Sequence, residues 1–252
     1  MDPQTIALPE GYRLIFHSEL DSTNAEGLRL LASGEPEHVW IWALSQTGGR
    51  GRHGRKWQSL SGNLFASLLL RPDCAPAIAS QIGFVGALSV HQAITELAQG
   101  REINLKLKWP NDLLLNGEKA AGLLLESTLD GTGRLAVVMG IGLNLSAHPQ
   151  DVEYPATDLA NHGIGANPAK ALQCLAGAAA QWLSVWENGA GFDRIRNAWD
   201  ERALPRGTAL EVRLADERLR GSYQGLDRHG GLILTQADGS ERRITSGDIF
   251  PL

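Results

Sequence analysis

The strongest constraint on the fold is a change of sequence pattern near Pro205. Before this residue, apolar segments of strand length alternate with segments whose apolar residues recur at helical spacing. After it, the chain contains only short alternating segments separated by Gly and Asp turns, which is typical of a small β-barrel of about 45 residues. We therefore predict two domains: residues 1–204, an α+β fold with a mixed sheet and flanking helices, and residues 205–252, a small β-barrel.

Periodicity and turn signals predict the individual elements of the first domain. Strands are expected at 12–16, 39–44, 63–70, 105–109, 112–115, 119–127 and 134–145, and helices at 23–34, 78–98, 168–186 and 192–203. Thr23 and Glu26 have the spacing of a capping box at the start of the first helix. Asn116-Gly117 between two apolar runs predicts a β-hairpin. Asn167 followed by Pro168 predicts a helix start.

Bulk properties limit the classes of function. The chain has 252 residues, 43% of them hydrophobic, and a formal net charge of −5, which differs from the basic surface of a general nucleic-acid binder. No basic segment followed by an apolar one opens the sequence, and no apolar run approaches about 18 residues, so we expect neither a secretory signal nor a membrane span. Cys74 and Cys174 lie apart from other candidate ligands, which favours reduced thiols in the cytoplasm.

A glycine-rich basic loop follows the strand predicted at 39–44. The segment Ser45–Trp57, SQTGGRGRHGRKW, holds four Lys or Arg residues and four Gly residues. Arg side chains bind carboxylates and phosphates through paired hydrogen bonds, and glycines let the backbone approach a ligand closely. The residue order fits neither a Walker A motif nor a Rossmann fingerprint. The loop therefore either closes over a small anion or is a solvated basic loop.

Two further clusters carry candidate functional groups. In KLKWPNDLLL a proline sets a turn after a strand and presents Lys108, Asn111 and Asp112 at the strand end. A Lys can bind phosphate and an Asp can bind a metal or an attacking amine, but each can equally form a surface ion pair. Lys119 lies one hairpin away and could reach the same pocket. In GIGLNL, Asn144 either caps a turn or hydrogen-bonds an adenine.

Taken together, these segments resemble the biotin protein ligases, in particular the short members that lack an N-terminal DNA-binding module. GRGRHGRKW is similar to the family's G-R-G-R-x-G-R-x-W loop, and KWPNDLLL with KAAGLLLE is similar to its K-W-P-N-D…K-x-x-G-[IL]-L-x-E core. GIGLNL resembles its G-[IL]-G-[IL]-N strand, and DSTN its first biotin-contacting turn. RGSYQGLDRHGGLIL resembles its C-terminal SH3-like barrel. The resemblance spans residues 12–252 and implies a biotin/lipoate ligase-like catalytic domain followed by that barrel.

The resemblance also implies a reaction. Biotin would be activated by ATP as biotinyl-5′-AMP, with release of pyrophosphate, and then transferred to a specific lysine of the biotin carboxyl carrier domain of acetyl-CoA carboxylase. Mg²⁺ would accompany ATP. The basic loop would be disordered when empty and would order over the adenylate, keeping it from water. No nucleic-acid partner, repressor activity or membrane partner is expected, and a homodimer is allowed.

Site residues follow from the same resemblance, position by position. Those implied to bind biotin are Ser22, Thr23, Asn24, Gln46, Gly49, Arg50, Gly51, Arg52, Lys119 and Gly122. Those implied to bind ATP or the adenylate are Arg52, Arg55, Trp57, Lys108, Asn111 and Asn144. Those implied to act in catalysis are Lys119, Lys108, Asp112 and Arg52. Asp112 would either hold Mg²⁺ or help to deprotonate the incoming lysine. Trp57 would pack against adenine, and Trp and Leu side chains of 39–44 would line the biotin pocket.

Two other functions have to be weighed against this one. A lipoate-protein ligase or an octanoyltransferase would share the core architecture. A transferase would use a Cys or Lys nucleophile and no adenine site, whereas Cys74 and Cys174 lie outside all the clusters. A nucleic-acid-binding regulator would need basic residues gathered on one face. The C-terminal segment mixes both signs of charge instead.

Overall fold

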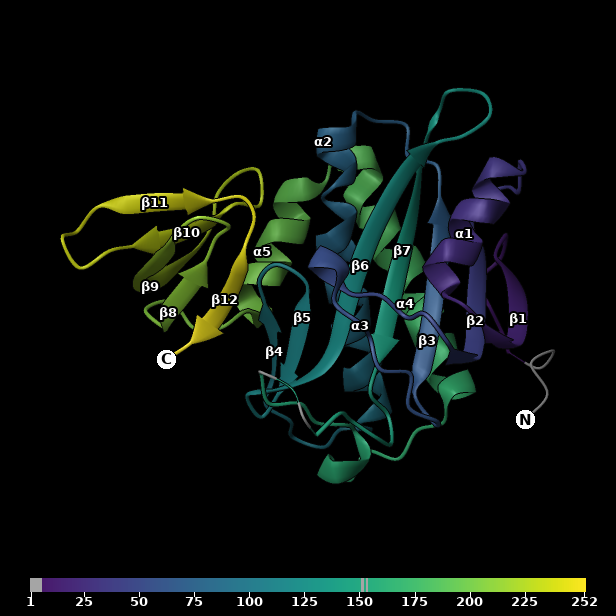
Figure 1. The fold of residues 1–252 in the computed structure, drawn as a ribbon, viewed down its shortest axis with the longest axis horizontal. Helices are drawn as coiled ribbons and strands as arrows, with labels where there is room; N and C mark the ends of the chain where they lie inside the picture. Colours follow the sequence, from purple (N-terminus) through teal and green to yellow (C-terminus); the bar gives the residue numbers. More distant parts are fainter. Residues whose placement is uncertain (1–5, 151, 153) are drawn as a thin grey trace.

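Two β-sheets organise the molecule (Figure 1). The computed structural model describes residues 6–150, 152 and 154–252. The larger sheet has seven strands in the order β1-β2-β3-β7-β6-β5-β4, and the smaller has five in the order β11-β10-β9-β8-β12. β1 pairs with β2 in parallel, and the remaining neighbours of the larger sheet are antiparallel. The predicted mixed sheet with flanking helices is confirmed.

The elements lie where the sequence predicts them, with shifted ends, except that the one helix predicted at 78–98 is divided into two. The larger sheet contains β1 (Arg13–Leu20), β2 (Val39–Gln46), β3 (Leu64–Leu70), β4 (Leu105–Lys108), β5 (Asp112–Leu115), β6 (Glu118–Leu129) and β7 (Leu135–Leu143). The helices are α1 (Thr23–Ala32), α2 (Pro76–Ala79), α3 (Ile82–Leu97), α4 (Pro168–Trp186) and α5 (Phe192–Arg202). The smaller sheet contains β8 (Ala209–Arg213), β9 (Arg218–Leu226), β10 (Leu232–Thr235), β11 (Glu241–Ile244) and β12 (Asp248–Pro251).

Two of the three local signals are confirmed. Asn116 and Gly117 have φ of 52° and 87°, the left-handed pair that a tight hairpin between β5 and β6 requires. Asn167 caps α4 by accepting a hydrogen bond from the Lys170 backbone N–H at 2.9 Å. Both confirmed signals depend on residues close together in the sequence and on no contact with a distant segment.

The capping-box prediction for α1 is wrong by one residue. The N-cap is Ser22, whose Oγ accepts from the Ala25 backbone N–H. Thr23 is instead engaged with β2: its backbone N–H and its hydroxyl both donate to Gln46 Oε1, at 2.8 and 3.2 Å. Thr23, which the local pattern predicted as the N-cap of α1, therefore bonds to Gln46 of the sheet instead.

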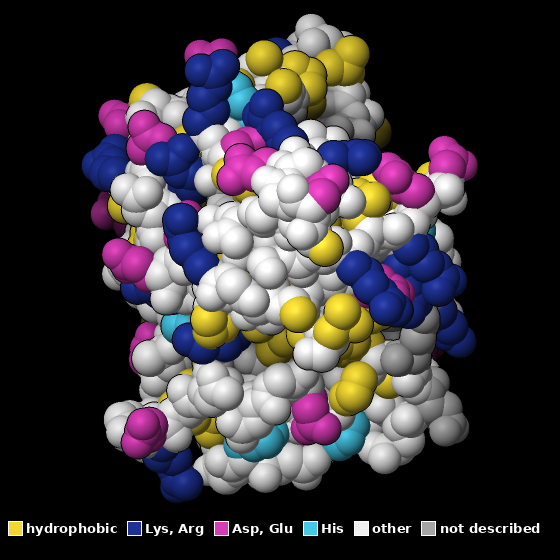
Figure 2. Space-filling model, turned by 90° about the vertical axis from the view of Figure 1, so that its left-hand side faces the viewer, with side chains coloured by type: hydrophobic (Ala, Val, Ile, Leu, Met, Phe, Trp, Pro, Cys, Tyr) yellow, Lys and Arg dark blue, Asp and Glu magenta, His cyan; other side chains and the backbone are white. Residues whose placement is uncertain are grey.

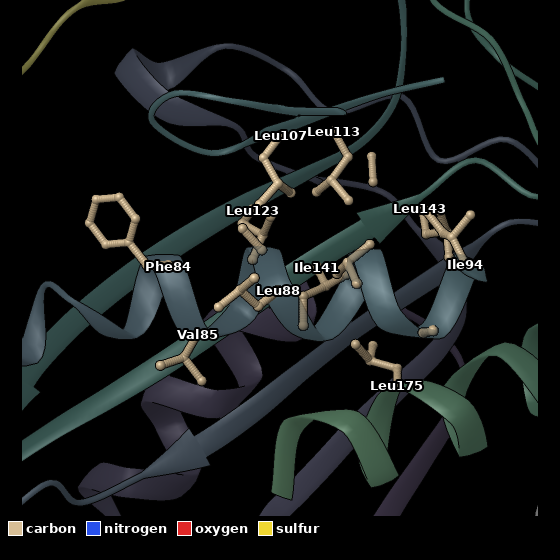
Figure 3. Close-up of a cluster of buried hydrophobic side chains, with 14 of the residues drawn as sticks. Phe84, Val85, Leu88, Ile94, Leu107, Leu113, Leu123, Ile141, Leu143 and Leu175 are labelled. Atoms are coloured by element: carbon tan, nitrogen blue, oxygen red, sulfur yellow. The ribbon is translucent and has the colours of Figure 1, made fainter. Parts of the chain in front are cut away.

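Helices cover the two faces of the larger sheet differently. On one face α1 packs closely against β3 and β7, because Gly27 leaves room for the side chains of Val138 and Leu69. On the other face α3 approaches β6 and β7 at Gly86, and α4 packs beside α3. Figure 3 shows the apolar side chains buried between α3, α4 and strands β4 to β7. The α1 face is left only partly covered, and this is where a ligand can enter.

One helical stretch is long and apolar enough to cross a membrane by length and composition, although no such run was expected from the sequence. It runs from Pro76 to Leu97, and its most apolar window has a mean hydropathy of 1.3 and is 61% buried in the fold. Contacts with β4 to β7 and with α4 cover α3. The apolar composition is therefore explained by the position of α3 in the core.

The smaller sheet is fastened beside the β4–β5 turn of the larger one. The indole N–H of Trp109 donates to the Gly230 carbonyl at 3.0 Å, and Gly230 also lies against the Phe84 ring. The connection from α5 to β8 contains the boundary predicted between residues 204 and 205. Because β12 pairs with β8 at the end of this sheet, its residues Asp248 to Phe250 are brought back toward the larger sheet.

We predict that protonation of His91 on α3 lowers the free energy of unfolding at acid pH. Burial lowers the pKa of His91 to about 4, and Arg202 and Lys106 act in the same direction. The imidazole is neutral in the fold but protonates near pH 6.5 in the unfolded chain. Its stabilising effect should therefore be complete above pH 6.5 and be lost as the pH falls towards 4, by ~3 kcal/mol. Urea unfolding between pH 4 and 7 measures this, and His91→Gln should flatten the curve. An unchanged curve in the variant would refute the assignment.

Candidate active site

A cavity of about 280 Å³ opens on the α1 face of the larger sheet. Its walls come from the start of α1, the loop after β2, the β4–β5 turn, β6 and β7 with the loop that follows, and β12. The sequence-predicted residues that line it are Ser22, Thr23, Asn24, Gln46, Arg50, Gly51, Arg52, Arg55, Trp57, Lys108, Asn111, Asp112, Lys119, Gly122 and Asn144. All the clusters that the sequence singled out thus meet in one place.

The basic loop after β2 is folded back on itself as a narrow hairpin. The Gly51 N–H donates to the Arg55 carbonyl at 2.7 Å, and the Trp57 N–H donates to the Gly49 carbonyl at 3.0 Å. Gly54, at the tip, has φ of 73°. A Cβ on Gly49 would lie 2.8 Å from the Trp57 carbonyl oxygen. Gly49 is the one predicted site residue that does not line the cavity, because it is needed for close packing within the loop.

Two glycines form a flat floor under the indole of Trp57. Gly122 on β6 and Gly142 on β7 are cross-strand neighbours. A Cβ on Gly142 would overlap the Trp57 ring, and one on Gly122 would lie 3.0 Å from it. In the described part of the chain the indole Nε1 is buried without a hydrogen-bond partner. Only a residue pair without side chains lets a planar group lie this close to the sheet.

The end of the cavity at α1 is polar and uncharged. Thr23 donates to the Gln46 side chain, and Gln46 Nε2 in turn donates to Ser59 Oγ at 3.2 Å. Ser67 Oγ lies 2.6 Å from Asn24 Oδ1 and 2.7 Å from Thr23 Oγ1. Thr23, Asn24 and Ser67 are buried. Because the groups of this network fix one another, they form a rigid set of donors and acceptors suited to a neutral polar ligand.

The opposite end is built around a largely buried carboxylate, whose side chain is 12% exposed. Asp112 Oδ2 lies 3.2 Å from Lys108 Nζ, and Oδ1 lies 2.5 Å from Lys119 Nζ. Burial alone would raise the pKa of Asp112, but the two ammonium groups outweigh it and the pKa is lowered. Burial lowers the pKa of Lys108, which is only 6% exposed, and Asp112 opposes that shift. The Asp112 carboxylate therefore offsets the repulsion between the Lys108 and Lys119 ammonium groups.

The C-terminal strand completes this end of the cavity. Asp248 on β12 forms ion pairs with Arg52, at 3.6 Å, and with Arg55. Arg52 Nη1 also donates to the Gly247 carbonyl at 3.1 Å and to Asn111 Oδ1 at 3.4 Å. The basic loop is thus held between the β4–β5 turn and the smaller sheet.

Sequence reasoning missed several lining residues. Tyr154 and Phe250 surround the Lys108 ammonium, whose Nζ lies 3.9 and 5.6 Å from their ring centroids. Neither these rings nor Asp248 stand in a local motif, so only the fold reveals them. The expectation that Trp and Leu side chains of 39–44 line the pocket is wrong. Trp40 and Trp42 are buried in the main core, on the side of the sheet that faces α3 and α4.

The charge of the cavity favours an anionic ligand. Among the described residues that line it, six are Lys or Arg (Arg50, Arg52, Arg55, Lys56, Lys108 and Lys119) and two are carboxylates, Asp112 and Asp248. On the face shown in Figure 2 the two signs of charge are interspersed. Among the described residues no three His, Cys, Asp or Glu side chains cluster as a metal site. The cavity therefore combines an uncharged polar end with a positively charged end.

We predict that Asp112 is needed for stability as well as for the site. Asp112→Asn leaves Lys108 buried without a counter-charge, so the free energy of unfolding in urea should fall by about 3–5 kcal/mol. The double variant Lys108→Met/Asp112→Leu removes both charges and should recover most of that loss while remaining inactive. If the double variant is no more stable than the single one, the buried ion cluster does not account for the effect.

Comparison with known proteins shows similar chains and domains. Residues 19–144 match the Biotin/lipoate A/B protein ligase family, and residues 210–250 match the Biotin protein ligase C terminal domain. The chain is 40% identical to a biotin--[acetyl-CoA-carboxylase] ligase from Paracoccus denitrificans, over 91% of this chain and 97% of that one. It is 34% identical to the bifunctional ligase/repressor BirA of Bacillus subtilis, over 95% of this chain and 74% of that one.

A solved structure shows the same architecture. The biotin protein ligase from Aquifex aeolicus in complex with biotin and ATP superimposes with a TM-score of 0.79 at 27% identity, covering 95% of this chain and 99% of that chain. The agreement extends over both sheets. The chain belongs to the biotin/lipoate A/B protein ligase family, and within that family it is a biotin protein ligase.

Proposed function

We propose that the protein joins biotin to ATP in this cavity and then passes the biotinyl group to the biotin carboxyl carrier domain of acetyl-CoA carboxylase. In the first step a biotin carboxylate oxygen attacks the α-phosphorus of ATP, and pyrophosphate leaves. In the second, the ε-amine of the acceptor lysine attacks the biotinyl carbonyl, and AMP leaves. The Paracoccus relative is named for ligation to acetyl-CoA carboxylase, which supports this acceptor.

The observation that carries the proposal is the division of the cavity into two chemically different ends. The fixed donors and acceptors of Thr23 and Gln46 suit the neutral ureido group of biotin. The two lysines beside Asp112 and the two arginines paired with Asp248, at the other end, suit phosphates. Between them lies the Gly122–Gly142 floor. An acyl-adenylate has this same order of groups: a neutral ring, a chain, and a phosphate joined to adenosine.

The charged residues would act on the reacting groups. Lys119 Nζ lies 5.6 Å from the centroid of the Trp57 ring, at the edge of the floor, where it can stabilise the biotinyl carbonyl oxygen. Lys108 would offset the charge that develops as pyrophosphate leaves. Arg50 and Arg52 would close over the biotin carboxylate and the α-phosphate, and Trp57 would shelter the adenine.

Asn144 suits adenine through one of its two amide atoms. Its Nδ2 is occupied, because it donates to the Thr157 carbonyl at 3.0 Å. The remaining oxygen is an acceptor, which matches the exocyclic amino group of adenine. Thr157 thereby fixes the orientation of the amide, since the opposite orientation would place two oxygens together.

The described residues of the cavity do not fit a magnesium ion held by the protein. Both oxygens of Asp112 already contact ammonium groups, and Asp248 is paired with two arginines. Mg²⁺ that enters with ATP would therefore be held by the phosphates, and its chemistry would be to withdraw charge from them. Because its pKa is lowered, Asp112 is also a weak base; its place between the lysines suits charge compensation.

The net charge of −5 and the mixed charges of the C-terminal segment support a ligase without repressor activity or nucleic-acid partner. Free Cys74 and Cys174 support a place in the reducing cytoplasm. The sheet architecture allows a homodimer through strand edges.

The test is incubation of the pure protein with ATP, Mg²⁺ and a biotin carboxyl carrier fragment, with either biotin or lipoate added. Intact mass of the fragment should increase by one biotinyl group, only when ATP is present, and not with lipoate. A fragment whose acceptor lysine is changed to arginine is the matched control. Acylation by lipoate and not by biotin would replace this proposal with a lipoate ligase.

Loss of Arg52 should release the intermediate. Arg52→Gly removes the contacts that tie the loop to β12 and Asn111, so the adenylate should escape and biotinylate lysines of bystander proteins. Albumin added to the assay and probed with streptavidin measures this leakage. Arg242→Gly, on exposed β11, is the control. If the Arg52 variant labels only the carrier fragment, the proposed role of the loop is wrong.

A further inference from the structure

Glu126 ends the KAAGLLLE segment and does not line the cavity, yet it contacts two residues that do. Its two carboxylate oxygens each lie 3.0 Å from Arg50 Nη2. Its Oε2 also accepts a hydrogen bond from Asn24 Nδ2 at 2.8 Å. The side chains of Glu126 and Arg50 are 26% and 43% exposed. One carboxylate therefore joins the basic loop to the first turn of α1.

The sheet fixes this arrangement. Side chains alternate along β6, so Gly122, Leu124 and Glu126 share the cavity face. Leu124 is paired with Gly140 on β7, and a Cβ on Gly140 would overlap the Asn24 side chain. The amide of Asn24 is thus seated over a glycine and donates to the Leu124 carbonyl at 3.2 Å as well as to Glu126. Glu126 completes the enclosure of this amide.

The loop is held from two sides. At its tip Arg52 and Arg55 pair with Asp248 of the smaller sheet. At its stem Arg50 pairs with Glu126 of the larger sheet. The stem contact is the one that reaches Asn24, and Asn24 also contacts Ser67 of the uncharged network. The position of the loop stem and the alignment of the uncharged end are therefore linked through a single side chain.

We propose that Glu126 is a positioning residue that holds the stem of the basic loop closed and couples this closure to the biotin end of the cavity. The proposal rests on the proposed function, in which that end receives biotin. Glu126 does not line the cavity, so it acts on the reacting groups only through Arg50 and Asn24. Its loss should loosen the loop and weaken biotin binding while leaving the chemical steps intact.

The loop itself supplies a direct readout, since trypsin cleaves after Arg and Lys. In the ligand-free protein, Glu126→Gln should raise the rate of cleavage after Arg52 and Arg55 about fivefold, the factor that corresponds to ~1 kcal/mol. Glu217→Gln is the matched control, because Glu217 pairs with Arg242 at 2.8 Å on the surface of the smaller sheet. It should leave the cleavage rate unchanged. Arg50→Gln should raise the rate equally, and the double variant no further.

Steady-state kinetics provide the second readout. Glu126→Gln should raise the KM for biotin about fivefold, following the same loss of closure, with kcat close to that of the wild type. A cleavage rate equal to that of the wild type would overturn the proposal. So would a fall in melting temperature without a selective increase in loop cleavage, because this indicates a purely structural role. If the wild type does not ligate biotin at all, the proposed function fails, and the cleavage rates still decide the role of Glu126.

Discussion

A carboxylate buried between two ammonium groups is the interaction on which the site depends. Lys108 and Asp112 are paired residues on β4 and β5, and Asp112 is in turn opposite Gly122 on β6. The hairpin register therefore places the ion cluster directly beside the glycine floor. Without the carboxylate, the two ammonium groups would repel each other. With it, their charge is compensated at the place where phosphates are expected.

The glycines of β6 and β7 shape the cavity as much as its charged side chains do. Gly122 and Gly142 let the Trp57 ring lie on the sheet. Two residues before Gly142 on β7, Gly140 likewise lets the Asn24 side chain lie against the sheet. Each of these contacts brings a segment from outside the sheet onto its surface: the basic loop in one case and the start of α1 in the other. Close approach of backbone and polar side chains thus shapes the cavity, and the apolar core on the α3 side of the sheet supports it.

The sequence predicts what is encoded locally. Strand and helix positions, the Asn116-Gly117 turn and the Asn167 cap follow from spacing and turn chemistry, and every site residue implied by the motifs except Gly49 lines one cavity. Contacts between segments that are distant in the sequence were not predicted. Thr23 turns toward Gln46 instead of capping its helix, Trp40 and Trp42 face the core instead of the pocket, and Asp248 reaches arginines 193 or more residues away. Such contacts depend on sheet order and have no local signature.

The most direct test of the account is a crystal structure with biotin, Mn²⁺ and an ATP analogue in which a methylene group joins the α- and β-phosphates. We predict that Asp112 stays between Lys108 and Lys119, with the lysines contacting the ligand and the anomalous signal of Mn²⁺ on the phosphates alone. Mn²⁺ bound directly to Asp112, with either lysine displaced, would contradict the central claim that this carboxylate serves to hold two positive charges at the reacting groups.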